Sequence, residues 1–321
     1  MRLAQLKQDI INYSQEIGID KIGFASADVF TQLKERLRQQ QALNYQSGFE
    51  KGTIEERTEP QRLLPQAQSI ISIALAYPTK IKNPPKSTKE DRRGIFCRAS
   101  WGTDYHVVLR DRLEKLDAFI KQHYPDAVTK IMVDTGELSD RAVAERAGIG
   151  FIGKNTMLIT REFGSFVYLG ELITNIPFEP DQLLEESCGD CRLCLDACPT
   201  GALVQGGQLN AKKCLAYLTQ TKEFLEEQFR VKLGTRIYGC DTCQLVCPWN
   251  KQIDFHLHEE FEPEPEIAKP KLKPMLSMSN REFRETFGHV SGAWRGKKPL
   301  QRNAIIGLAH FKDETAIKDL A

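Results

Sequence analysis

The cysteine residues are the first feature of this sequence that points to chemistry. Four of them follow one another at short spacing and end in a proline, as Cys188-x2-Cys191-x2-Cys194-x3-Cys198-Pro199. This spacing is the ligand run of bacterial ferredoxins, in which the fourth cysteine binds a different [4Fe–4S] cluster from the first three. A loop with a thiolate at every third residue can wrap one cubane, while Cys198 is carried away from it. The run therefore predicts iron–sulfur chemistry.

A second cysteine group, Cys240-x2-Cys243-x3-Cys247-Pro248, lacks one leading cysteine, and the isolated Cys214 is available to replace it. We therefore predict two [4Fe–4S] clusters that exchange ligands. The first is assigned to Cys188, Cys191, Cys194 and Cys247, and the second to Cys198, Cys214, Cys240 and Cys243. The alternative is structural zinc, because C-x2-C pairs also form four-cysteine zinc sites. The three-cysteine loop and the two Cys-Pro endings are far more specific for clusters.

The bulk composition is that of an ordinary globular protein with room for about two domains. The 321 residues are 41% hydrophobic and 27% charged, and 44 basic against 43 acidic side chains leave a net charge of +1. This total names no partner, although it can hide a local basic face. No run of 18 apolar residues occurs, and residues 1–18 have an amphipathic helical pattern, so we expect a cytoplasmic protein without a membrane partner. An odd number of cysteines argues against a disulfide framework.

The helices and strands that precede the cysteines must form the site at which the electrons reduce a substrate. Periodicity predicts helices over 3–17, Asp104–Tyr124 and Asp140–Ala147 and strands over Lys21–Ala25, Ser69–Ala76, Thr129–Val133 and Phe166–Ile173. The buried face of the second helix is predicted to carry Leu109, Leu113, Leu116 and Ile120. Ser139 is a plausible N-cap of the third helix, and Gly148 ends it. This alternation indicates an α/β region.

The residue pattern of the sequence changes near Cys188, where cysteines become frequent. Gly206–Gly207 predicts a turn, Lys213–Phe229 a helix, and residues 258–274 an acidic, proline-bearing connector. A basic stretch and a terminal helical pair with a turn at Lys312–Asp313 follow. Because one such pair cannot bury both of its faces, it must dock on the body, or the chain is a shortened form. We predict three regions, 1–175, 176–262 and 263–321.

Motifs outside the cysteines give a resemblance to a known family. They are CRASWGTDYH (97–106), DTGELSDR (134–141), GFIGKN (150–155) and GSF (164–166). Together with both cysteine groups, this set resembles the epoxyqueuosine reductases, which perform the last step in making the tRNA wobble nucleoside queuosine. The resemblance runs through most of the chain.

The resemblance implies a fold of class α+β or α/β in three parts. Residues 1–175 would form an α/β domain that binds base-off cobalamin, and 176–262 a ferredoxin-like domain with two [4Fe–4S] clusters. Residues 263–321 would form a basic, HEAT-like helical segment that contacts tRNA. The implied partners are a tRNA with a GUN anticodon and an external low-potential electron donor, and we expect a monomer. Removing an epoxide oxygen takes two electrons and protons, which cobalamin and low-potential clusters can help to deliver.

Asp134 is the candidate general acid, because a carboxyl at the end of a strand can enter a cofactor cleft and be kept protonated by burial. It could instead cap the loop that follows. The cofactor-binding residues implied by the resemblance are Arg57, Cys97, His106, Asp134, Arg141, Lys154, Asn155, Leu158, Ser165 and Leu169. Cys97 could equally be a buried small hydrophobe, His106 a structural histidine, and Arg57 part of a solvated face.

The basic C-terminal stretch is the candidate tRNA contact, because cations bind phosphates and aromatic rings stack on splayed bases. Its candidates are Arg281, Phe283, Arg284, Trp294, Arg295, Lys297, Lys298 and Arg302. A basic stretch can also be only a solvated surface. Two other functions have to be weighed. A reductive dehalogenase would typically carry a twin-arginine export signal, which residues 1–18 lack, and a ferredoxin-type carrier would not need about 175 residues before its clusters.

Overall fold

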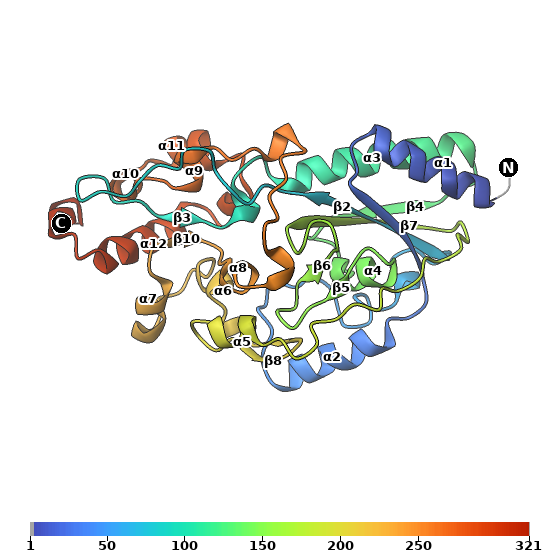
Figure 1. Cartoon of the computed structure of the whole chain (residues 1–321), viewed down its shortest axis with the longest axis horizontal. Coiled ribbons are helices and arrows are strands. Elements are labelled where there is room, and N and C mark those ends of the chain that lie inside the picture. The colour runs from blue at the N-terminus through green and yellow to red at the C-terminus, as the bar shows by residue number, and fades with distance from the viewer. Residues whose placement is uncertain (1–2, 321) are drawn as a thin grey trace. The chain divides into compact units, whose positions relative to one another are not determined.

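The computed structural model describes residues 3–320, which form two compact units (Figure 1). The first unit comprises the residues up to Ala76, Tyr105–Arg192 and Gln205–Gln208. The second comprises Tyr77–Asp104, Leu193–Val204 and the residues from Leu209 onward. Within 3–320, no helix is both long enough and apolar enough to cross a membrane. The three regions predicted from the sequence, 1–175, 176–262 and 263–321, divide the chain by function and not by contacts. That division stays a prediction.

The first unit is built on a four-stranded sheet with the order β1-β2-β7-β4. The strands are β1 (Lys21–Ser26), β2 (Ser69–Ala76), β7 (Val167–Thr174) and β4 (Thr129–Met132). All four were predicted to within about one residue at each end. Every pairing in the sheet is antiparallel, so this unit is α+β, and the narrower expectation of an α/β domain is wrong. Buried strands are apolar runs in either class, so the pattern alone did not give their direction.

Helices cover both faces of this sheet, as Figure 1 shows. On one face, α1 (Leu3–Glu16) packs on α3 (Tyr105–His123), and α3 packs on β7. The predicted apolar face of α3 is confirmed, because Leu109, Leu113, Leu116 and Ile120 are all fully buried. On the other face, α4 (Asp140–Arg146) packs on β1, β2 and β7.

The chain around α4 differs in one detail from expectation. Ser139 occupies the N-cap position, but its hydroxyl makes no capping hydrogen bond. Gly148 ends the helix as predicted, with a φ of +69° that favours glycine. A two-stranded sheet of β5 (Phe151–Ile152) and β6 (Leu158–Ile159) follows α4 in the chain. Elsewhere in this unit, the helix α2 (Thr31–Ala42) has no buried residue.

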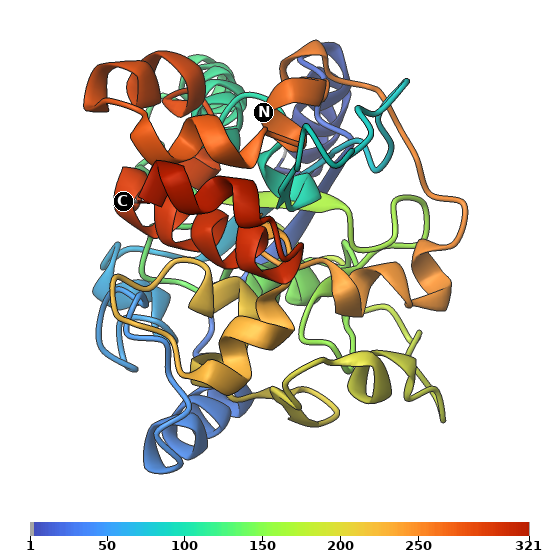
Figure 2. The ribbon, with the colours of Figure 1, turned by 90° about the vertical axis from the view of Figure 1, so that its left-hand side faces the viewer.

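The second unit has a two-stranded parallel sheet of β3 (Ile95–Phe96) and β10 (Arg236–Tyr238), and α12 (Lys297–His310) packs on β10. In the view of Figure 2, α10 (Leu272–Ser277) lies against α12, and it also contacts α13 (Ile317–Leu320). The terminal helical pair and its turn are confirmed, although Ala321 lies outside the described residues. The other short elements are α5 (Leu193–Ala197), β8 (Leu203–Gln205), β9 (Gln208–Leu209), α8 (Thr242–Leu245), α9 (Pro265–Ala268) and α11 (Asn280–Phe287).

Two expectations for this unit are wrong. The helix predicted over Lys213–Phe229 is two short helices, α6 (Leu215–Leu218) and α7 (Glu227–Leu233). The acidic stretch 258–274, predicted as a connector, is part of the packed unit, because it contains α9 and places Phe261 and Leu272 in the interior at 2% and 0% exposure. Tertiary contacts override the local pattern in both places.

Close packing between β1 and α4 generates a stability prediction. A Cβ atom on Gly23 would lie 2.2 Å from the Ala147 carbonyl oxygen, which is backbone and cannot move aside cheaply. We expect Gly23→Ala to lower the free energy of unfolding by about 1–3 kcal/mol through overpacking. The control is Gly170→Ala, whose Cβ meets the end of the flexible Leu113 side chain at 3.0 Å. Urea unfolding compares them, and equal losses would contradict the account.

Candidate active site and cluster ligands

Asp134 lies in a strained turn directly after β4. Its φ is +48°, and the Thr135 N–H donates to the Val133 carbonyl, which closes a γ-turn around it. A non-glycine residue in this conformation costs about 1–3 kcal/mol and is characteristic of functional sites. The Asp134 N–H donates to Asp140 Oδ2 at 3.0 Å, so the first residue of α4 holds the turn.

Two side chains from the start of α3 meet the Asp134 carboxylate at one oxygen. The Tyr105 hydroxyl donates to Oδ2 at 2.7 Å, and His106 Nε2 lies 3.4 Å from the same atom. The Tyr105 ring stacks on His106 and on Tyr168, with centroids 4.3 and 4.6 Å apart. This stack fixes the donor geometry around Asp134.

The protonation state expected for Asp134 needs correction. Partial burial raises the pKa of Asp134, but the hydrogen bonds from His106 and Tyr105 and the charge of Arg141 outweigh it, so the pKa is lowered. The side chain is also 56% exposed. Asp134 therefore rests as a carboxylate here, and burial does not keep it protonated.

A second acidic group lies behind Asp134 in the sheet. Glu171, in the middle of β7, is fully buried, and burial followed by the charge of Asp140 raises its pKa well above the usual range. Burial and the neighbouring Asp134 charge raise the pKa of Asp140 to about 6. The sequence analysis missed Glu171, although a single acid inside the apolar strand VYLGELIT was a usable signal.

Two arginines give this site positive charge. Burial lowers the pKa of Arg57; Glu50 opposes this effect, and the neighbouring Arg141 adds to it. The Arg141 guanidinium donates to the Thr156 carbonyl and, at 3.3 Å, to the Thr156 hydroxyl. Two guanidinium groups near each other favour an anion or a polar amide between them.

Lys154 binds the first cysteine loop. Its N–H donates to Cys188 Sγ at 3.4 Å, and its ammonium donates to the carbonyls of Gly189 and Cys191 at 2.5 and 3.0 Å. A backbone N–H that donates to a cysteine sulfur stabilises the thiolate. When that thiolate binds a cluster, the hydrogen bond also changes the reduction potential of the cluster. Lys154 thus orders a ligand loop, a role that the sequence analysis had not assigned to it.

Asn155 is a buried residue with an unused donor. It is 4% exposed, and its Oδ1 accepts the Met157 N–H at 3.1 Å. Its Nδ2 is buried and has no hydrogen-bond partner within residues 3–320. Since buried donors are nearly always paired, a ligand acceptor fits here. Leu158 belongs to the core under α4 and Leu169 packs against it, whereas Ser165 is 1% exposed.

The second unit gathers the four cysteines assigned to the second cluster. Burial first, and then the nearby Cys214, Cys240, Cys194 and Cys198 thiols, raise the pKa of Cys243 to about 12. Backbone N–H groups, including that of Ala202 at 3.3 Å, outweigh burial and lower the pKa of Cys198. The thiols of Cys198, Cys214 and Cys240 thus lie near Cys243, but so does that of Cys194, and the division of ligands between two clusters stays a prediction.

The ligands assigned to the first cluster are divided between the units, so this set stays a prediction. Cys188 and Cys191 belong to the first unit, and Cys194 and Cys247 to the second. Within the second unit α5 packs on α8, and both Cys194 in α5 and Cys247 after α8 are buried. In the described part of the chain, no three His, Cys, Asp or Glu side chains converge closely enough to hold a single metal ion.

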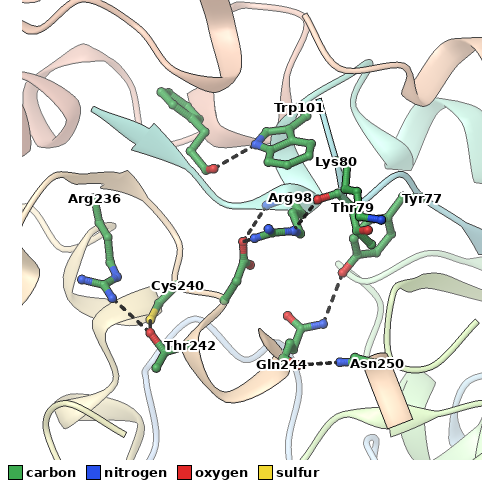
Figure 3. Close-up of polar contacts among 12 residues, drawn as sticks. Tyr77, Thr79, Lys80, Arg98, Trp101, Arg236, Cys240, Thr242, Gln244 and Asn250 are labelled. Atoms are coloured by element: carbon green, nitrogen blue, oxygen red, sulfur yellow. Dashed lines mark hydrogen bonds and ion pairs between the residues drawn. The ribbon is translucent and has the colours of Figure 1, made fainter. Parts of the chain in front are cut away.

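Cys97 lines a cavity of about 600 Å³ in the second unit, together with Cys240. Arg98 also lines this cavity, and Figure 3 shows its polar contacts: its Nη1 donates to Asp241 at 3.0 Å and its Nε to the Thr79 carbonyl at 2.8 Å. Burial, Asp241 and Cys240 raise the pKa of the Cys97 thiol well above its usual range. Cys97 therefore lies near Cys240, a predicted cluster ligand, within the second unit.

Comparison with known proteins agrees with this arrangement. The family described as "Epoxyqueuosine reductase QueG, DUF1730" matches residues 57–135, and the "4Fe-4S double cluster binding domain" matches residues 187–250. The chain is 67% identical to the epoxyqueuosine reductase of Bacillus cereus and 64% identical to that of Bacillus subtilis. These alignments cover 100% of this chain and 84% and 83% of the two relatives. The chain belongs to the epoxyqueuosine reductase family.

Solved structures of the family have the same fold. A crystal structure of epoxyqueuosine reductase with an epoxyqueuosine-modified stem loop of tRNA-Tyr matches with a TM-score of 0.98 and 64% identity. It covers 99% of this chain and 85% of that one. The enzyme of Streptococcus thermophilus matches with a TM-score of 0.94 and 50% identity, over 98% and 84% of the two chains. The mixed α+β fold with a double-cluster domain is thus confirmed for this family member.

The basic stretch of this reductase-family chain is only partly available for RNA. Phe283 is 7% exposed and packs in the core, so its predicted stacking role is wrong. Arg302 is also engaged inside the unit, where its guanidinium donates to the carbonyls of Leu218, Thr221 and Glu223. Trp294 is 53% exposed, and Arg284 and Lys298 lie at the surface.

The assignment of Cys214 generates a prediction about iron. Cys214→Ser should lose one of two clusters, and with it about half of the iron, because a [4Fe–4S] cluster needs all four thiolates. Iron analysis and an optical spectrum of protein purified without oxygen measure this loss. The matched control is Cys97→Ser, which should keep the full iron content although it also removes a half-buried thiol. Full iron in Cys214→Ser would refute the ligand set.

Proposed function

We propose that this chain reduces the epoxide of epoxyqueuosine at the tRNA wobble position to give queuosine. The observation that carries the proposal is the match, over 99% of the chain, to a relative crystallised with an epoxyqueuosine-modified stem loop. The reaction breaks both carbon–oxygen bonds of the epoxide, forms a carbon–carbon double bond and releases water. It consumes two electrons and two protons. An external low-potential donor supplies the electrons, which two [4Fe–4S] clusters accept one at a time.

The cofactor proposed for the first region is base-off cobalamin, and the residues present fit it. The buried, unpaired Asn155 Nδ2 can donate to a side-chain amide or a phosphate of such a ligand. Arg57 and Arg141 offer charge-assisted hydrogen bonds to the same groups, and Ser165 and Leu169 are further proposed contacts. Cobalamin, when bound, supplies a low-valent metal centre that is a strong nucleophile or reductant. His106, which lies 3.4 Å from the Asp134 carboxylate, is a further proposed contact.

Asp134 is proposed to donate a proton to the oxygen that leaves the epoxide. A structure of the Bacillus subtilis enzyme has its Asp134 catalytic loop swung out of the active site, which supports a catalytic role for the corresponding loop here. The strained γ-turn around Asp134 is the local feature that would let this loop adopt a second conformation. Because Asp134 rests as a carboxylate, it must receive a proton before it can donate one.

The proposed tRNA contact comprises Arg284, Trp294 and Lys298, on the surface of the second unit. Arginine and lysine would bind the phosphates of the anticodon arm, and the exposed tryptophan ring offers a stacking surface. The proposed substrate is a tRNA with a GUN anticodon, and the proposed working form is a cytoplasmic monomer.

The central test of this function is turnover by the protein and by Asp134→Asn. Wild-type protein with clusters, cobalamin and a reductant should convert epoxyqueuosine in tRNA to queuosine, followed by mass analysis of nucleosides. Asp134→Asn should lose about 10²-fold or more of the rate, because general acid catalysis contributes about 10²–10⁴-fold. Its iron content and its affinity for tRNA should be unchanged. Full turnover by the variant would remove the proton-donor role.

Salt dependence tests the proposed tRNA contact. If Arg284 and Lys298 each bind one phosphate, the double variant Arg284→Ala/Lys298→Ala should reduce the slope of log K against log[salt] by about 1.4–1.8. Arg281→Ala is the control, because the Arg281 guanidinium already pairs with Glu285 at 2.8 Å. Equal effects of the double variant and the control on the slope would reject this surface.

A further inference from the structure

Glu171 is a fully buried acid in the central strand of the first unit. In the sheet it pairs with Met132 on β4 and with Ser72 on β2. Its neighbour in sequence, Gly170, faces α3, where a Cβ atom would meet Leu113. Because side chains alternate along a strand, Glu171 faces the opposite side of the sheet, which α4 covers. Asp140, the first residue of α4, is the acid it meets there.

The contact between Glu171 and Asp140 requires a shared proton. Among residues 3–320, no N–H or O–H group donates to either carboxylate oxygen of Glu171. Its hydrogen-bond partner is the Asp140 carboxyl, which has no proton to donate when ionised. Two carboxyl groups can form this bond only if one of them is protonated, and a buried, unpaired charge is very costly. The raised pKa values of both groups agree with this arrangement.

The same pair touches the turn that carries Asp134. Asp140 Oδ2 accepts the Asp134 N–H, so Asp140 lies between Glu171 and Asp134. The other charged or titratable groups facing these acids are Tyr105 and His106 from α3, Arg141 from α4, and Arg57 from the segment before β2. Tyr105 and His106 favour the ionised form of Asp134. A protonated acid pair thus lies next to an ionised acid that has to be protonated.

We propose that Asp140 and Glu171 form a buried proton store that reprotonates Asp134 in each catalytic cycle. This proposal rests on the proposed reduction of an epoxide. In each cycle the Asp134 O–H bond breaks and its proton leaves with the epoxide oxygen, and solvent supplies the second proton of the released water. The Asp140 carboxyl then transfers the shared proton to the Asp134 carboxylate, and solvent restores the proton to the pair. The two electrons come from the external donor, so the proton transfer itself oxidises and reduces nothing. Glu171 acts through Asp140 and is a positioning residue.

The first test detects the stored proton without any turnover. Infrared spectra of the cluster-loaded protein at neutral pH should contain the carbonyl band of a protonated, buried carboxylic acid. Glu171→Gln should remove this band, because the amide donates to Asp140 and leaves it ionised. Ser72→Ala is the matched control, since it removes a buried hydroxyl paired in register with Glu171 and leaves both acids intact. A wild-type spectrum without the band would overturn the proposal.

The second test is the pH profile of single turnover with epoxyqueuosine-containing tRNA. Glu171→Gln should lower the rate at neutral pH by at least about tenfold and regain it as pH falls, because solvent then protonates Asp134 directly. Asp140→Asn should behave in the same way, which covers a failure of the Gln variant to fold. A purely structural role would lower the rate equally at every pH, and that result would also overturn the proposal. If the wild-type protein converts no epoxyqueuosine, the proposed function fails. The proposal that the proton store serves this reaction then fails with it.

Discussion

The backbone ladder of β7 is the constraint on which the first unit depends. β7 pairs with β2 from Val167↔Ala76 to Thr174↔Ser69, and with β4 from Glu171↔Met132 to Thr174↔Thr129. The register against β4 fixes the point at which that strand ends and hence the position of the Asp134 turn. A slip of one residue would turn Glu171 from the α4 face to the α3 face and separate it from Asp140. The register of one strand therefore sets the geometry of all three acids.

That geometry gives neighbouring carboxyl groups opposite protonation states. Asp134 is half exposed and has donors from Tyr105 and His106, so its pKa falls. Glu171 has no such donor and lies in the interior, so its pKa rises. Groups whose environments push their pKa values apart can divide the work of holding and passing a proton. The difference here comes from position in the sheet, because all three side chains have nearly the same intrinsic acidity.

Much of this fold could be predicted from local sequence, since the strongly periodic elements are formed where expected. β2 was predicted to the residue, and the apolar face of α3 is fully buried. The helix expected over Lys213–Phe229 failed for a reason outside that segment. Arg302 donates to the Leu218 carbonyl, where α6 ends, and Asn303 Nδ2 donates to the Thr219 carbonyl at 2.8 Å. Residues about 80 positions away thus satisfy the carbonyls that a longer helix would have used.

Some residues of the candidate site could likewise be predicted from local sequence spacing, whereas others depend on contacts between distant parts of the chain. Cysteine ligands follow a loop spacing that the cluster itself demands, so their number and most of their grouping could be predicted without any structure. Even the isolated Cys214 could be proposed as a ligand, because a cluster with three ligands is incomplete. Glu171 has no motif, and its role depends on strand register, on the face that α4 covers and on the absence of nearby donors. The proton chemistry of this chain therefore needs its three-dimensional structure, whereas its electron chemistry is already evident in the order of its residues.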